Sequence, residues 1–511
     1  MRNRVFPRDL TIACVAFWTI SSACPRAEQE IRAPAVAGQF YPSDPAKLKL
    51  AVQQFLKDAV QASVEKPLAL VVPHAGYIYS GQIAADAYRQ ASGRDYDVVV
   101  ILGTNHTSMN FNGISVWPRG AYQTPLGKMP VDENVAMALL AEDKDCTANL
   151  TSQVQEHSVE VQVPFVQVLF PAAKIVPVVV GRPDLEMCTH FGAVLAKVLK
   201  GRKPLIVASS DLSHYPAYED ANKTDRRTLE ALVQLDPKGF AVATRALLSQ
   251  NVSNLDTCAC GEAPILAAIA AAKSLGATRG VVVSYANSGD AAIGDRSRVV
   301  GYGAVVLTTG PAGSDTKALN RRVSLPSPGP LSASDRKALL ALARETIRRF
   351  LSTETMPLPR GFSPRLQSLQ GAFVTLRSSG ELRGCIGHMP ADFPLAQTVG
   401  TVAAQAAFND PRFKALTESE LPTVEIEISV LTPMKPVASA DSIQVGRDGV
   451  VLVKGNQSAV FLPQVAVENK WGRVEMLDNL CLKAGLPRGA WKQGAHFLVF
   501  QAEVFSEAAH K

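Results

Sequence analysis

Buried-type aliphatic runs alternate with amphipathic segments through the first 308 residues of the chain. Six runs rich in valine, leucine and isoleucine have the length of buried strands: 68–72, 98–102, 175–180, 205–209, 280–285 and 304–307. Between them, residues 81–90, 184–199 and 264–275 carry apolar side chains at helical spacing. Because strands and helices alternate, we expect residues 31–308 to form a layered α/β domain with a mainly parallel sheet.

The pattern changes after residues 309–330, which are rich in turn residues and are expected to form a linker. Residues 332–351 predict an amphipathic helix with an N-capping Ser332. Strand patterns follow at 373–376, 382–386, 424–431, 449–453 and 459–462. Residues 463–484 predict one helix, with Trp471, Val474, Leu477 and Cys481 on one face and Gly485 after its end. We therefore expect residues 331–507 to form a smaller α+β domain.

Composition and charge narrow the class of protein. At 511 residues the chain is too long for a single core, which supports two domains. Its 47% hydrophobic and 19% charged residues are typical of globular proteins. The net charge of +6 is small for this length and no dense lysine or arginine run is present. We therefore expect no nucleic-acid partner.

The N-terminal segment has the pattern of an export signal. Arg2, Arg4 and Arg8 precede an apolar run at 10–20, and small residues lead to Cys24. We expect residues 1–27 to be a signal peptide or lipoprotein signal and the chain to be exported, periplasmic or lipid-anchored. The alternative is an uncleaved extension on a cytoplasmic protein. The apolar run is too short for a permanent span, so no transmembrane span is expected in the mature chain.

Three expected strands end close to a histidine: His74, His106 and His214. The carboxyl ends of parallel strands share one edge of a sheet, where ligands bind. Neutral imidazole is a common metal ligand. The three histidines therefore predict one shared site that holds a metal ion, to which Asp211 adds a carboxylate and residues 156–160 (EHSVE) add a further polar cluster.

The eight cysteines are too sparse for a disulfide framework in a chain of this length. Only Cys258 and Cys260 are close together in the sequence. Cys258 has three interpretations: a redox partner of Cys260, a second soft metal ligand, or a small buried residue, which is the favoured one. In an exported protein, a disulfide between the two would compete with metal binding.

The first domain resembles the Memo family over about residues 32–307. The resemblance rests on seven segments that occur in order: IRAPAVAGQFYP (31–42), VVPHAGYIYSG (71–81), LGTNH (102–106), EHSVEVQ (156–162), SSDLSHY (209–215), CGEAPI (260–265) and SGDAAIGDRSRVVGYGA (288–304). It implies a fold like that of the class III extradiol dioxygenases, which hold non-haem iron with two histidines and a carboxylate. In Memo-like proteins a cysteine takes the place of that carboxylate.

Carried over by motif, the resemblance assigns the metal ligands to His74, His106 and Cys260. It places His214 in the acid–base position, with Asp211 beside it. A thiolate beside two imidazoles favours copper, zinc or a more covalent iron site. We therefore expect one metal ion, iron or copper, with zinc as the alternative. The polar neighbours Asn105, His157 and Glu160 are expected to line the pocket or to orient the ligands.

The second domain resembles the AMMECR family over about residues 331–505, through LRGCIG (382–387), FNDPRF (408–413) and residues 462–486. The family supplies no established reaction. Cys385 is a candidate reactive thiol because a neighbouring cation such as Arg383 stabilises a thiolate, although a buried strand cysteine is favoured. Memo-like and AMMECR-like proteins are commonly encoded with a radical SAM protein, in a grouping called AmmeMemoRadiSam, so the resemblance implies a radical SAM partner.

Two hypotheses of function follow. The first is a mononuclear metal-dependent redox enzyme, a dioxygenase-like oxidoreductase in which His214, assisted by Asp211, moves protons on an unidentified small molecule or peptide. The second is a non-catalytic metal- or peptide-binding scaffold that works with the radical SAM partner. The sequence contains neither a GxxxxGK[ST] phosphate loop nor a GxSxG elbow, which argues against a nucleotide-dependent enzyme or a serine hydrolase.

Overall fold

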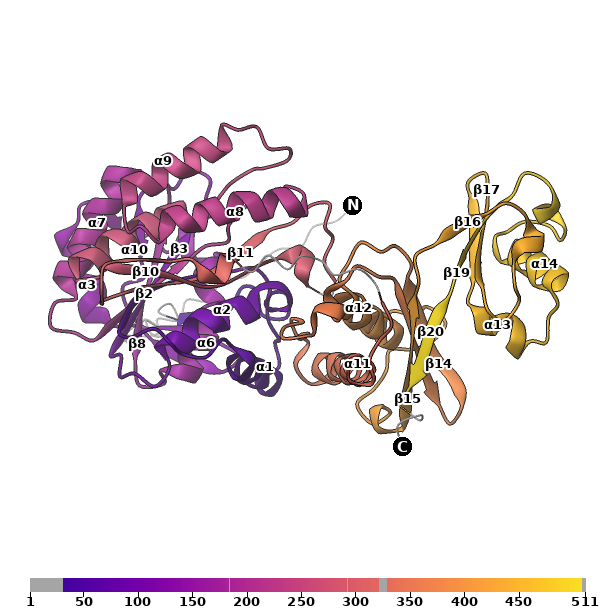
Figure 1. Ribbon diagram of the computed structural model, residues 1–511. Helices are drawn as coiled ribbons and strands as arrows, with labels where there is room; N and C mark the ends of the chain where they lie inside the picture. The colour runs from indigo at the N-terminus through magenta and orange to yellow at the C-terminus, as the bar shows by residue number, and fades with distance from the viewer. Residues whose placement is uncertain (1–30, 183, 292, 321–328, 508–511) are drawn as a thin grey trace, which may run out of the picture.

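The computed structural model describes residues 31–182, 184–291, 293–320 and 329–507 (Figure 1). The expected signal at residues 1–27 lies outside the described residues. The larger, N-terminal part is built on a mixed sheet of nine described strands. In spatial order they are β12 (Gly313–Asp315), β10 (Arg279–Asn287), β11 (Gly301–Thr308), β2 (Pro67–Val72), β9 (Pro204–Ser209), β3 (Val98–Thr104), β8 (Lys174–Val180), β4 (Ile114–Val116) and β7 (Cys146–Thr147).

Parallel pairing holds the centre of this sheet and occurs again at its two edges, between β10 and β12 and between β4 and β7. In the centre, β2, β9, β3 and β8 lie side by side and run in the same direction. By contrast, β11 is antiparallel to both β10 and β2, and β4 is antiparallel to β8. Five of the eight pairings between described strands of this sheet are parallel, so the sheet is mixed and the expected mainly parallel sheet is found only in part. No α-helix separates β10 from β11 in the chain, so the second of these strands returns in the opposite direction.

Helices cover both faces of the sheet (Figure 1). On one face α2 (Tyr77–Ala91) lies against β2, β10 and β11 and packs on α1 (Pro45–Asp58). On the other face α10 (Glu262–Ser274) lies against β2, β9 and β3 and packs on α7 (Leu185–Val198). The other helices of this part are α3 (Glu133–Glu142), α4 (Thr151–Val154), α5 (His157–Glu160), α6 (Val163–Leu169), α8 (Tyr218–Leu232) and α9 (Pro237–Leu248).

All six strands and all three helices predicted for the first domain are present, with ends shifted by a few residues. Every residue of β3 is buried, because helices cover the central strands on both faces. This burial explains why the sequences of these strands are continuous apolar runs rather than alternating ones. A small separate sheet of β1 (Ile31–Arg32), β5 (Ala121–Thr124) and β6 (Gly127–Pro130) joins the same core through Tyr122 and Met129.

The first part of the expected linker belongs to the large sheet. Residues Gly313–Asp315 form β12, which pairs in parallel with β10 at the edge of the sheet. Residues 321–328 lie outside the described residues. The turn-rich composition of 309–330 had concealed this strand because its three residues, GSD, carry no apolar side chain.

The C-terminal part contains two four-stranded sheets and their helices. The first sheet has the order β14 (Glu381–His388), β13 (Ala372–Ser378), β15 (Val424–Leu431), β20 (Ala502–Ser506). It packs against α11 (Ala333–Thr353) and α12 (Leu395–Phe408), and α11 begins at Ser332, as predicted. The second sheet has the order β16 (Lys435–Val437), β19 (His496–Phe500), β17 (Gly449–Lys454), β18 (Gln457–Phe461).

The single helix predicted over 463–484 is wrong. The structure has two short helices, α13 (Pro463–Glu468) and α14 (Arg473–Lys483), which are separated by Lys470 in the left-handed region (φ 58°). Within α14, Leu477 and Cys481 are buried, whereas Val474 in its first turn is 57% exposed. A left-handed lysine has no strong sequence signature, which is why the apolar period alone did not reveal the break.

The two parts of the chain contact each other through buried charges. Arg360 of the C-terminal part pairs with Asp86 of α2 at 2.7 Å, and the Asp86 side chain is completely buried. Arg349 of α11 pairs with Asp58 at the end of α1. The second part therefore packs on the α1–α2 side of the first (Figure 1). No helix within the described ranges has the length and apolar character needed to cross a membrane.

Candidate metal centre

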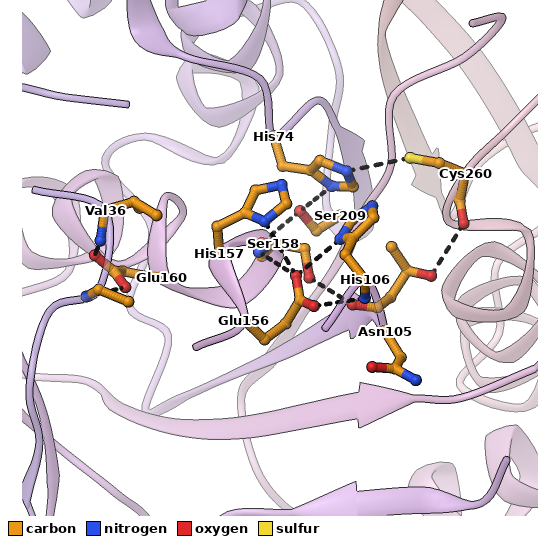
Figure 2. Close-up of polar contacts among 12 residues, drawn as sticks. Val36, His74, Asn105, His106, Glu156, His157, Ser158, Glu160, Ser209 and Cys260 are labelled. Atoms are coloured by element: carbon orange, nitrogen blue, oxygen red, sulfur yellow. Dashed lines mark hydrogen bonds and ion pairs between the residues drawn. The ribbon is translucent and has the colours of Figure 1, made fainter. Parts of the chain in front are cut away.

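His74 is buried just beyond the carboxyl end of β2 (Figure 2). Its Nδ1 lies 3.1 Å from Ser209 Oγ, which donates to the Ser158 carbonyl at 2.6 Å and accepts from Gln162. Since the only hydroxyl proton of Ser209 points to Ser158, the oxygen accepts from Nδ1–H of His74. This arrangement leaves the lone pair of His74 Nε2 free to bind a cation.

Glu156 fixes a second imidazole, that of His106, which follows β3. The backbone N–H of His106 donates to Glu156 Oε2 at 2.6 Å, and its Nδ1 lies 2.9 Å from Oε1 (Figure 2). With Nδ1–H bound to this carboxylate, Nε2 of His106 also keeps its lone pair. The neighbouring His157 ring stacks on His106 with 4.5 Å between ring centroids, and its Nδ1 lies 3.4 Å from Glu156 Oε1.

Cys260 and Asp211 approach His74 from the other side. Cys260 Sγ lies 3.1 Å from His74 Nε2 (Figure 2), and Asp211 Oδ2 lies 4.0 Å from the same nitrogen. The backbone N–H of Cys260 donates to the Asp211 carbonyl at 3.2 Å, and the Cys260 carbonyl accepts from Thr104 at 3.0 Å. The loop that carries the thiol is therefore tied to the ends of β3 and β9.

Gly261 permits this close approach. A Cβ at this position would lie 2.5 Å from the Ser209 carbonyl oxygen and 2.6 Å from Ser210 Cβ. We expect Gly261→Ala to displace Cys260 from His74 and to lower metal affinity by at least about tenfold while every ligand residue remains. Metal content after dialysis is the measurement, with Gly472→Ala as control, because Gly472 lies in the second domain at φ −74° and an added Cβ there would meet no atom within 4 Å. Equal metal retention in the two variants would contradict the expectation.

The ligand atoms form two groups that share His74. One group is His74, His106 and His157, and the other is His74, Asp211 and Cys260; within each group the atoms lie within 4.8 Å of one another. This donor set of imidazoles, one thiol and one carboxylate, with free Nε2 lone pairs, fits a metal ion. The set implied by the resemblance, His74, His106 and Cys260, is neither of these groups: it combines the shared His74 with His106 from the first and Cys260 from the second. His157, expected to orient ligands, is itself placed among the candidate ligands.

A cavity of about 500 Å³ opens beside these groups. His74, His106, His157, Asp211 and His214 all border it. The Nε2 atom of His214 is buried and has no hydrogen-bond partner among the described residues. An unpartnered buried nitrogen is costly, so a ligand in the cavity is the natural partner for it. No hydrogen bond joins His214 to Asp211 within the part of the chain described, and Asp211 instead accepts from the backbone N–H of His74 at 2.8 Å.

Burial keeps the imidazoles neutral. It lowers the pKa of His74 and His214, and burial together with repulsion from His74 lowers the pKa of His157 to about 4. Burial opposes ionisation of Glu156, but the hydrogen bond and charge of His106 outweigh it and hold the pKa of Glu156 at about 2. At neutral pH His74, His157 and His214 are therefore neutral and Glu156 is ionised. Burial also raises the pKa of the Cys260 thiol, so a bound cation has to displace the thiol proton.

The pKa of His157 predicts an acid sensitivity of the metal-free protein. Between pH 6.5 and about 4 the unfolded chain binds a proton at His157 that the folded chain does not, so stability rises with pH across this window. We expect His157→Gln to flatten this dependence by up to about 3 kcal/mol. Urea unfolding at pH 7 and pH 4.5 measures it. His190→Gln, at an exposed histidine of α7, is the control and should keep the wild-type slope.

Two residues expected near the ligands do not border the cavity. Asn105 binds its own loop: its Nδ2 donates to the Ser108 carbonyl at 2.7 Å and its Oδ1 accepts from the Ser108 N–H. Glu160 lies apart from the histidines (Figure 2), accepts from the backbone of Ala35 and Val36, and pairs with Arg32. Glu160 therefore holds the segment around residues 32–41 in place and does not orient a metal ligand.

The remaining singled-out cysteines lie outside this cluster. Cys258 is a buried free thiol whose Sγ faces the Thr244 carbonyl, which agrees with the favoured interpretation. Cys385 lies half-buried in β14 with its Sγ 3.4 Å from Thr375 Oγ1. The cation expected to activate it, Arg383, pairs instead with Glu420 at 2.9 Å.

Two contributors to the site were not assigned from the sequence. The sequence places Glu156 only in a polar cluster, residues 156–160, and Ser209 only in a segment that resembles the Memo family. Both act on partners far away in the chain: Glu156 is 50 residues from His106, and Ser209 is 135 residues from His74. The EHSVE segment, which combines acidic residues with a histidine before an apolar helix, was the one available signal.

Comparison with known proteins identifies a family for each of the two domains. A family model described as "Memo-like protein" matches residues 32–306, more than half of the chain. The chain belongs to the Memo family. A second family model, AMMECR1, matches residues 340–505, so a Memo domain and an AMMECR1 domain lie in tandem.

Several relatives share the first domain. A MEMO1 family protein of Saccharolobus solfataricus is 39% identical over 286 residues, which cover 53% of this chain and 97% of the relative. One from Methanopyrus kandleri is 35% identical over 291 residues, which cover 55% of this chain and 99% of the relative. Apart from these relatives of the first domain, a solved structure matches a smaller share of the chain: an uncharacterized protein from Pyrococcus horikoshii is 36% identical, with 33% of this chain and 90% of that chain covered and a TM-score of 0.32.

Proposed function

We propose that the Memo domain is a mononuclear metal-dependent redox enzyme that uses iron or copper. The observation that carries this proposal is the convergence of His74, His106, Cys260 and their neighbours beside a cavity of about 500 Å³. A carboxylate–imidazole–thiol set suits these metals, and zinc is the alternative. A bound iron or copper ion would supply one-electron chemistry at the edge of the sheet.

The residues around the cluster have distinct tasks in this proposal. His74, His106 and Cys260 hold the metal, and Glu156 and Ser209 orient the two imidazoles through their Nδ1 atoms. His214 accepts a proton from a substrate in the cavity, because its buried Nε2 is unpartnered among the described residues and burial keeps the ring neutral. Asp211 holds the His74 backbone and acts on His214 through its charge, which opposes the lowering of the His214 pKa.

Oxygen uptake tests whether the site turns over. The full-length protein, loaded with Fe(II) or copper, is mixed with ascorbate, and its oxygen consumption is compared with that of the same metal in buffer. We expect uptake above the buffer value, which falls to background in His74→Ala and by about 10²-fold in His214→Gln while metal content stays at the wild-type level. Uptake equal to that of free metal would reject the enzyme and favour the metal- or peptide-binding scaffold.

The partner and the location belong to the same proposal. We propose a radical SAM protein as partner, on the basis of the tandem Memo and AMMECR1 domains. We also propose export through residues 1–27, which conflicts with a cytoplasmic partner. Fractionation of cells that express the full chain decides between them: periplasmic or membrane-anchored protein supports export, and cytoplasmic protein supports the partner.

A further inference from the structure

One wall of the cavity is formed by the segment that connects β10 to β11. Ser288, Ile293, Gly294, Asp295 and Arg298 of this segment border the cavity together with the histidines. Apolar and aromatic side chains border the same space, among them Phe40, Tyr79 and Tyr302. The cavity therefore combines a metal-binding end, an apolar body and a polar loop.

Arg298 is a cation without an acidic partner among the described residues. Its guanidinium lies over the Tyr215 ring, 4.0 Å from the centroid. The same loop carries two acidic groups: Asp290 accepts from the Tyr218 hydroxyl at 2.7 Å, and Asp295 accepts from the Ser297 N–H and hydroxyl at 2.8 Å. Neither forms an ion pair with Arg298 among the described residues. A guanidinium that stacks on a ring keeps its in-plane N–H groups free for an anion.

The ring under Arg298 is held in an unusual backbone conformation. Tyr215 has φ +74°, in the left-handed region that residues with a side chain rarely adopt. Its N–H donates to the Val299 carbonyl at 2.7 Å, which joins it to the residue that follows Arg298. Strain of this kind persists only where the surrounding structure fixes it, and it is concentrated at binding sites. Tyr215 also follows His214, so the strained residue connects the unpartnered imidazole to the unpaired cation.

The AMMECR1 domain fixes this loop from outside. Gln397 of α12, which is buried, donates from Nε2 to the carbonyls of Gly289 at 2.6 Å and Ala291 at 3.1 Å. Arg296 lies between the rings of Tyr218 (4.0 Å) and Phe393 (5.0 Å) and donates to the carbonyl of Asp392 at 3.0 Å. The second domain thus holds both sides of the segment that carries Arg298.

From these contacts we infer that Arg298 is the anion subsite of the cavity, that it takes the carboxylate of a small molecule with an apolar or aromatic body, and that Gln397 of the AMMECR1 domain positions it. The inference names the substrate class of the proposed enzyme and so rests on the proposed function. A carboxylate fits one guanidinium in a bidentate manner. A phosphate dianion is disfavoured, because Arg298 is the one lysine or arginine among the residues that border the cavity and Asp211 and Asp295 border it too.

Calorimetric titration of the full-length protein with benzoate and with its neutral isostere benzamide tests the inference. We expect benzoate to bind at least about tenfold more tightly than benzamide. Arg298→Gln should abolish the preference for benzoate over benzamide. Arg298→Lys should keep part of it, because lysine retains the positive charge but lacks the paired N–H groups of the guanidinium. Arg227→Gln, which removes one exposed positive charge from α8, is the matched control and should keep the full preference.

Gln397→Ala tests the positioning by the second domain. We expect it to weaken benzoate binding severalfold without changing benzamide binding or metal content, which a general loss of structure would not do. Phenyl phosphate, titrated in parallel, should bind less tightly than benzoate. An undiminished preference for benzoate in Arg298→Gln would overturn the subsite, as would tighter binding of phenyl phosphate or no binding of benzoate at millimolar concentration.

The metal-poor variant His74→Ala separates this inference from the proposed function. If the benzoate preference persists there and still depends on Arg298, the subsite stands whether or not the metal enzyme does. If the preference disappears with the metal while Arg298→Gln has no effect, the carboxylate binds the metal and the subsite is rejected. Oxygen uptake, measured on the same samples, reports on the proposed function alone.

Discussion

Replacing His74 with alanine is expected to reduce bound metal from about one equivalent per chain to below roughly a tenth of that value. His74 is the residue that both candidate ligand groups share, and its Nε2 lies 3.1 Å from the Cys260 thiol. Ser209 fixes its imidazole through Nδ1, so that Nε2 faces the other candidate ligands. Removing His74 takes one ligand from both groups. Mass-spectrometric metal analysis after dialysis measures the loss. Ser209→Ala, which frees the ring without removing it, should lose only about 10- to 100-fold in affinity.

Variants of the residues that the groups do not share locate the metal. If the ion binds the three imidazoles, His106→Ala and His157→Ala lose metal while Cys260→Ser retains it. If it binds His74, Asp211 and Cys260, the pattern reverses. The set that the Memo resemblance implies predicts losses in His106→Ala and Cys260→Ser together, with His157→Ala affected least. Retention of metal in His74→Ala would contradict all three arrangements.

Replacing Glu160 with glutamine is expected to destabilise the first domain by about 3–5 kcal/mol, because it leaves a buried guanidinium without its counter-charge. Arg32 and Glu160 are each at most 1% exposed, and their side chains pair directly. Glu160 also accepts from the backbone of Ala35 at 2.8 Å and Val36 at 3.0 Å. Urea unfolding of the metal-free protein, followed through the transition of the first domain, measures the change.

A double-mutant cycle isolates the contribution of this pair. We expect Arg32→Met to be destabilising as well, and Arg32→Met combined with Glu160→Gln to cost clearly less than the sum of the two single changes. Additive costs would show that the two side chains act independently. Folded Glu160→Gln should still bind metal, because Glu160 is not among the candidate ligands.

The strand ends of the site were predictable from local pattern. His74, His106 and His214 follow apolar runs that only a buried central sheet accommodates, and parallel strands bring such ends to one edge. Apolar periodicity does not predict the places where the chain departs from regular structure. The pattern indicates neither the left-handed Lys470, which divides the last expected helix, nor the antiparallel direction of β11, which makes the sheet mixed.

Contacts between distant segments were beyond the reach of local pattern. Glu156 binds His106, which is 50 residues away in the sequence, and Cys260 contacts His74, which is 186 residues away. The partnership of Cys260 with the histidines came from the Memo resemblance, since nothing in its spacing reveals it. Likewise, the hydrogen bond from Gln397 to the Gly289 carbonyl joins two domains through residues that are 108 positions apart in the sequence. These are consequences of tertiary packing, which one sequence does not specify by periodicity.

The proposed metal centre requires first of all that the chain binds a metal ion. The full-length protein, purified without chelators and then loaded anaerobically with Fe(II) or Cu(I), is analysed for metal by mass spectrometry beside His74→Ala. We predict close to one equivalent of iron or copper in the wild type and its loss in the variant. Wild-type protein that holds no metal after loading, or metal that stays bound in His74→Ala, would contradict a metal centre at the edge of this sheet.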